Sequence, residues 1–168
     1  MLITRQSASN TLLLAATISL MLLAHAGAAA AAEQTLRFKL VTNVQAMGAP
    51  TVLPEVGGHK VTVGEYTGVA MLEDGRIAYK QFVDVSDDTA ESGEFKGYST
   101  YTFQNGDALT LSYTGGWNAK GAAGDYKVLA GTGAFAGATG TGHFEAADEK
   151  WDKAMLWDVS FQLTLPTQ

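Results

Sequence analysis

Histidine and cysteine are the first side chains to consider for acid–base or metal chemistry, and the chain has three histidines and no cysteine. His25 lies within the N-terminal segment that is expected to be cleaved, which leaves two histidines for the folded domain. His59 and His143 lie far apart in the sequence, and neither has a partner at the spacing of a metal site. The distances between these residues in the sequence do not exclude a Ser-His-Asp triad, but the chain has no Gly-x-Ser-x-Gly nucleophile elbow. His59 follows two glycines that indicate a turn, and His143 alternates with the apolar Phe144, so both are predicted to be solvated surface residues. We therefore predict no metal site and identify no catalytic set.

An acidic segment at residues 84–91 has the composition of a calcium loop. An EF-hand would require glycine and glutamate where Thr89 and Phe95 stand, so the segment is not an EF-hand. A looser calcium site built from Asp87, Asp88 and Glu91 stays open. The favoured interpretation is a solvated loop between two strands.

Polar side chains also occur on faces that are otherwise apolar. If those faces point inward, five residues would bring polar atoms into an apolar cavity, as in pockets that orient a small molecule. The alternative is an interior filled by its own side chains, with the polar atoms bonded to one another or to buried water. The cavity candidates are Tyr79, Gln81, Ser99, Tyr101 and Tyr113.

The glycine-rich stretch at residues 131–142 could be a phosphate cradle or a corner between strands. It lacks the lysine of a Walker A motif, and Ala136 stands where a dinucleotide fingerprint needs its third glycine. A strand pattern follows where a helix would be needed. These departures favour a corner in which glycines permit positive φ and Phe135 plugs one end of a barrel. The predicted corner residues are Gly131, Gly133, Phe135, Gly137 and Gly140.

Strands must position all these residues, because apolar residues alternate with polar ones along most of the chain. Asp74-Gly75 and Asn105-Gly106 are typical of tight hairpin turns. About eight short strands at intervals of roughly 8–12 residues, many joined as hairpins, predict an all-β, eight-stranded antiparallel closed barrel. Only residues 134–138 and 149–155 are expected to form a helical turn.

Two segments resemble the allene oxide cyclase and dirigent β-barrels. They are the Tyr-Lys-Val-Leu-Ala run at 126–130 with the glycine-rich corner that follows, and the hairpin at 98–112. The resemblance implies an eight-stranded antiparallel barrel with an apolar cavity, often assembled into trimers. It also implies chemistry on hydrophobic substrates without a metal or organic cofactor.

The resemblance does not extend to the known catalytic residues. Leu40 and Thr42 occupy the positions where plant allene oxide cyclases carry glutamate and asparagine, so that activity is not expected. The aspartate characteristic of the first dirigent strand is not evident either. We expect a barrel that binds a small hydrophobic molecule. The alternatives are a cofactor-free cyclase or isomerase, and a structural envelope protein with a filled barrel.

The N-terminus has the layout of a secretory signal peptide, with Arg5, an apolar run at 12–24 and two Ala-x-Ala sites. Cleavage after Ala26 or Ala32 is expected, giving a signal peptide over 1–32 and a single barrel domain over 33–168. Loss of Arg5 changes the net charge from −6 to −7, which disfavours nucleic acid and anionic membrane surfaces as partners. A bacterial secreted or periplasmic protein is predicted, with a homo-oligomer (dimer or trimer) left open.

Overall fold

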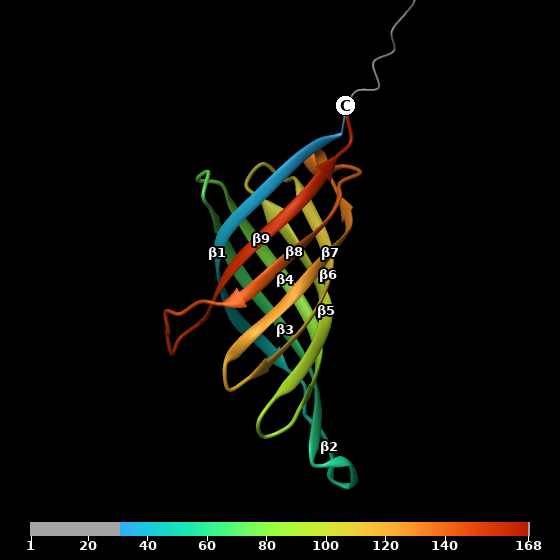
Figure 1. Cartoon of the computed structure of the whole chain (residues 1–168), viewed down its shortest axis with the longest axis vertical. Coiled ribbons are helices and arrows are strands. Elements are labelled where there is room, and N and C mark those ends of the chain that lie inside the picture. Colours follow the sequence, from blue (N-terminus) through green and yellow to red (C-terminus); the bar gives the residue numbers. More distant parts are fainter. Residues whose placement is uncertain (1–30, 168) are drawn as a thin grey trace, which may run out of the picture.

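The computed structural model describes residues 31–167, which form one antiparallel sheet that closes into a barrel (Figure 1). The strands follow one another along the chain with two short 3₁₀ helices between them. In order, the elements are β1 (Ala32–Met47), β2 (Thr51–Leu53), η1 (Pro54–Val56), β3 (His59–Leu72), β4 (Ile77–Asp88), β5 (Gly93–Phe103), β6 (Ala108–Asn118), β7 (Gly121–Gly131), η2 (Gly133–Phe135), β8 (Thr139–Ala146) and β9 (Met155–Leu165).

The barrel closes through β1, which pairs with β9 on one side and with β3 on the other. Phe38, for example, lies opposite Val159 of β9 and opposite Leu72 of β3. The short β2 pairs only with the start of β3, so eight strands make up the barrel wall. The predicted eight-stranded antiparallel barrel is therefore confirmed, and closure leaves the wall without a free edge.

Alternation along each strand sends one face into the barrel interior. In β1 the inward residues are Leu36, Phe38 and Leu40, while the lysine and arginine between them face solvent. Burying a leucine or phenylalanine contributes about 1.5–3 kcal/mol each, so this face is a principal source of stability. The remaining core includes Tyr101, Phe103, Leu109, Leu111, Tyr126, Phe144, Val159, Phe161 and Leu163.

The glycine-rich corner joins β7 to β8 through η2 and closes one end of the barrel. Phe135 is only 2% exposed, and its ring centroid lies 4.9 Å from that of Phe103. A side chain at Gly131 would collide with the Phe135 carbonyl oxygen, and Gly137 adopts φ 72°. A strand follows the corner, as predicted, and Gly133 and Gly140 complete it.

The two expected helical turns differ in outcome. The first is present as η2 at Gly133–Phe135. The second is wrong, because residues 149–155 contain a turn closed by a bridge between Trp151 and Ala154 rather than a helix.

Residues 1–30, which hold most of the predicted signal peptide and its first cleavage site, lie outside the described residues. Ala32, the second expected cleavage position, is the first residue of β1 and pairs with Leu165. Across residues 31–167, no helix has the length and apolar character needed to span a bilayer.

Candidate ligand cavity

A cavity of about 330 Å³ occupies the half of the barrel away from the Phe135 corner. Its rim lies where β1 and β4 end and β9 begins, marked by Met47, Asp88 and Met155. Inward residues of neighbouring strands meet here, and half of the residues that line the cavity are aromatic. These rings belong to Tyr66, Phe82, Phe95, Tyr113, Trp117, Tyr126, Phe144 and Trp157.

Lys80 lines this cavity from β4, and only 3% of the residue is exposed. Its Nζ donates a hydrogen bond of 2.8 Å to the hydroxyl oxygen of Tyr126 and lies 4.0 Å from the centre of the Phe82 ring. The rings of Tyr101 and Tyr113 are also close, at 5.3 and 5.4 Å. Burial lowers the pKa of Lys80 to about 7, although the nearby Asp84 carboxylate opposes this change. A substantial fraction of Lys80 is therefore a neutral amine near neutral pH.

Asp84 lies four residues further along β4 and faces the same interior. The Tyr113 hydroxyl donates to Asp84 Oδ2 at 3.1 Å, whereas the buried Oδ1 has no hydrogen-bond partner. Burial raises the pKa of Asp84, and the hydroxyls of Tyr113 and Tyr66 together with the Lys80 amine partly offset this change. Within residues 31–167, neither Asp84 nor Lys80 forms a direct ion pair.

The tyrosine hydroxyls connect these two groups to the deeper core. Tyr101 donates to the Tyr126 oxygen at 3.3 Å. Burial raises the pKa of Tyr101, Tyr113 and Tyr126 well above the ordinary tyrosine range, so all three remain protonated. Burial and the Asp84 carboxylate raise the pKa of Tyr66, at the cavity wall, to about 12. The cavity thus combines an amine, a carboxyl group and neutral hydroxyls.

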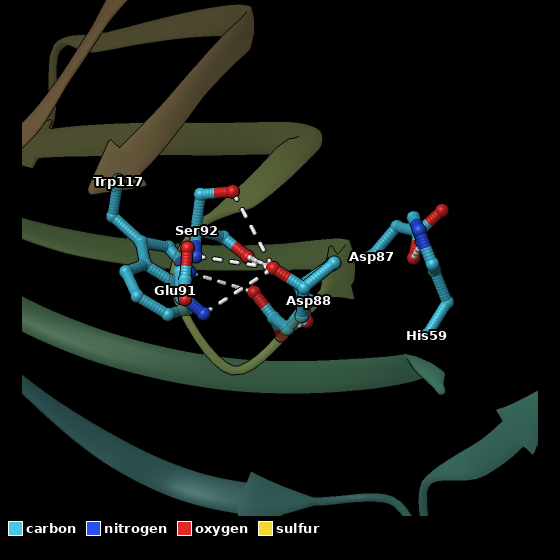
Figure 2. Close-up of polar contacts among 8 residues, drawn as sticks. His59, Asp87, Asp88, Glu91, Ser92 and Trp117 are labelled. Atoms are coloured by element: carbon cyan, nitrogen blue, oxygen red, sulfur yellow. Dashed lines mark hydrogen bonds and ion pairs between the residues drawn. The ribbon is translucent and has the colours of Figure 1, made fainter. Parts of the chain in front are cut away.

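The acidic loop lies at the cavity rim and divides its carboxylates between two sides of β4 (Figure 2). Asp88 turns inward, where it accepts hydrogen bonds from Trp117 Nε1 at 2.7 Å and Ser86 Oγ at 2.6 Å. Asp87 turns away toward His59, whose Nδ1 lies 2.7 Å from it. Residues 31–167 contain no cluster of three or more acidic or histidine side chains that could hold a metal ion. The loose calcium site is therefore not formed by this arrangement.

The structure separates the five predicted cavity residues into two groups. Ser99, Tyr101 and Tyr113 are buried inside the barrel, and Tyr113 lines the cavity. Tyr79, 47% exposed, and Gln81 lie on the outer face, so their predicted inward orientation is wrong. The Ser99 hydroxyl oxygen is buried without a hydrogen-bond partner.

The prediction of which β4 face points inward was wrong because the outer face of this strand is more apolar than its inner face. Ile77, Tyr79, Val83 and Val85 face outward, whereas Lys80 lies on the inward face. Hydrophobic alternation consequently indicated the wrong face and missed the two ionisable groups of the cavity. The neighbouring strand β5 could have indicated the correct face of β4, because residues paired across two strands lie on the same face. Ser99 and Tyr101 of β5 point inward, so their partners in β4 do as well.

Leu40 and Thr42 do lie on the inward face of β1. Leu40 lines the cavity, and the Thr42 hydroxyl oxygen accepts a 2.9 Å hydrogen bond from Trp157 Nε1. Leu40 thus contributes an apolar side chain to the cavity wall and Thr42 holds Trp157 in place, and neither residue supplies an ionisable group.

This closed barrel is of the dirigent type, which confirms the predicted resemblance at the level of the fold. The structure of the pterocarpan synthase dirigent protein GePTS1 matches with 18% identity over 96% of this chain and 98% of that chain, at a TM-score of 0.54. That of the pterocarpan synthase dirigent protein PsPTS1 matches with 13% identity over 83% of this chain and 99% of that chain, at a TM-score of 0.56. No sequence profile of a protein family matches, and neither does any curated protein.

Proposed function

We propose that this chain is an exported barrel protein that binds one small hydrophobic molecule in its cavity and holds a hydroxyl group of that molecule at Asp84. The observation that carries this proposal is the buried Asp84 Oδ1, which has no partner and lies in the wall of an aromatic cavity. An unsatisfied buried acceptor costs about 1–3 kcal/mol, and a ligand hydroxyl would offset that cost. The cavity volume of about 330 Å³ lies at the lower end of ligand pockets, which span roughly 300–1,000 Å³.

The binding proposal is tested with 2-naphthylmethanol, an aromatic alcohol without a carbonyl group. We expect it to raise the Tm of the wild-type chain by several degrees when its concentration is well above Kd. Ala122 lines the cavity and Ala123 beside it faces outward, so the two give a matched pair of variants. Ala122→Phe should abolish the Tm increase, whereas Ala123→Phe should retain it. An unchanged wild-type Tm, or equal responses of both variants, would contradict the proposal.

The proposed location is the bacterial periplasm or medium. The signal-like N-terminus and the absence of cysteine support it. N-terminal sequencing of protein recovered from its host distinguishes cleavage after Ala26 from cleavage after Ala32.

Self-association belongs to the same proposal. The exposed face of β3 and β4 carries Val69 beside Tyr79 and Val63 beside Val85, and Val83 adjoins Tyr98 of β5. A contiguous apolar face of this kind is typical of a contact between protein copies. We expect light scattering to give a multiple of the monomer mass, and Val83→Lys to reduce it. A monomeric wild-type chain would contradict this prediction.

A cofactor-free cyclase or isomerase is the second candidate function. The observation that favours it is that burial displaces the pKa values of Lys80 and Asp84 toward each other in one apolar cavity. Such a cavity can hold a flexible substrate near its reactive conformation and move a proton. The bound molecule would then be recovered with rearranged bonds, whereas simple binding returns it unchanged.

A further inference from the structure

Lys80 is the cavity group that the binding proposal leaves unexplained. Its Nζ is surrounded by aromatic rings from β4, β5, β6 and β7, and its hydrogen bond goes to the neutral hydroxyl of Tyr126. A lysine kept only for charge would face water or a carboxylate, because burying an ammonium is costly. Here the amine lines an open apolar chamber.

We propose that Lys80 captures small aromatic aldehydes by forming an imine inside the barrel. This inference rests on the proposed function, because it needs the cavity to admit a small apolar molecule. The aromatic wall favours a planar aryl group. A ligand with a carboxylate is disfavoured, because Asp84 already brings a carboxyl group into the same chamber.

The step needs no oxidant, reductant or cofactor. The lone pair of Lys80 Nζ forms a bond to the carbonyl carbon while the carbonyl π electrons move to the oxygen. A proton moves from the nitrogen to that oxygen to give a carbinolamine. The Tyr126 hydroxyl, 2.8 Å from Nζ, is positioned to pass this proton. Loss of the hydroxyl group with the second nitrogen proton then gives imine and one water molecule.

The electrostatic surroundings favour the neutral amine that this attack requires. Tyr101, Tyr113 and Tyr126 face Lys80 as neutral groups, and Asp84 is the nearby group that raises its pKa. Burial outweighs Asp84 and brings the pKa of Lys80 to about 7. The neutral fraction at about pH 8 therefore exceeds that of an ordinary lysine by about two orders of magnitude.

To test this proposal, the full folded chain is incubated with 2-naphthaldehyde in the presence of sodium cyanoborohydride. The cyanoborohydride reduces any imine to a stable secondary amine. Peptide mapping by mass spectrometry then locates the label. We expect Lys80 to be labelled at least about tenfold faster than Lys127, which faces outward beside Tyr126. Unfolding in urea should remove this selectivity. Equal labelling of surface lysines in the folded chain would overturn the proposal.

Three variants test whether the label depends on the Lys80 amine. Lys80→Met should remove the selective label, and Lys127→Met should leave it intact. Asp84→Asn removes a charge that favours the ammonium, so the pH midpoint of Lys80 labelling should fall. An unchanged midpoint together with unselective labelling would count against the amine as the reactive group.

The alcohol 2-naphthylmethanol distinguishes a cavity that binds ligands without forming an imine from a cavity that binds no ligand. If the alcohol raises Tm but the aldehyde does not label Lys80, the imine is overturned and the binding proposal stands. If neither occurs, both are overturned. Selective labelling without a Tm response to the alcohol supports the imine and contradicts the hydroxyl-binding proposal.

Discussion

Replacing Lys80 with Met is expected to raise the free energy of unfolding at neutral pH by about 2–4 kcal/mol. Burial lowers the pKa of Lys80 from 10.5 to about 7, which means that the folded interior penalises the ammonium. Methionine has a similar shape without the charge and fits among the surrounding rings. The lost hydrogen bond to Tyr126 offsets part of the gain. Urea denaturation monitored by circular dichroism measures the difference.

The same replacement should flatten the pH dependence of stability. The folded pKa of Lys80 lies below its unfolded value, so the unfolded chain binds more protons between them. Wild-type stability should therefore rise from about pH 7 to about pH 9, with the full penalty present below about pH 7. Tyrosines of the unfolded chain stay protonated in this window.

The matched control for this result is Lys127→Met on the outer face of β7. It should change the free energy of unfolding by no more than about 0.5 kcal/mol and leave the pH slope intact. Destabilisation by Lys80→Met, or an equal slope in both variants, would show that the Lys80 ammonium is not penalised in the folded barrel.

Phe135→Ala is expected to lower the free energy of unfolding by about 3–5 kcal/mol. The ring is almost fully buried at the closed end of the barrel and packs against Phe103. The collision that a side chain at Gly131 would make with the Phe135 backbone shows how closely this corner is packed, so collapse around the missing ring is restricted. Equilibrium urea unfolding gives the value.

Leu129→Ala is the control, because Leu129 is 50% exposed on β7 near the same end. Its expected effect is within about 1 kcal/mol. A loss below about 1 kcal/mol for Phe135→Ala would mean that the corner does not depend on this ring as a plug.

The fold was predictable because most strands carry an unambiguous apolar face. In β9, Val159, Phe161 and Leu163 alternate with polar residues, and all three are buried as the pattern predicts. The corner was predictable for a related reason, since Phe135 is the single large apolar residue among small ones. Burial of large apolar surface dominates at these positions, so local pattern and tertiary structure agree.

The candidate site was less predictable because it departs from this rule. Lys80 and Asp84 face inward despite their charge, on a strand whose outer face carries Tyr79 and Val83. Their partners Tyr113 and Tyr126 come from β6 and β7, so only closure of the barrel brings the four residues together. Places where local reasoning fails in this way are often functional sites.

The position of β1 between β9 and β3 has a consequence for the order of folding. Each strand from β3 to β9 pairs with the next one along the chain, so these hairpins can assemble progressively. Pairing of β1 with β9 joins the most distant strands, and such non-local contacts slow folding to roughly milliseconds to seconds in barrels of this kind. The chamber around Lys80 has no complete wall until that late step. A molecule held there cannot guide the earlier steps, so its stabilising effect acts mainly by slowing unfolding.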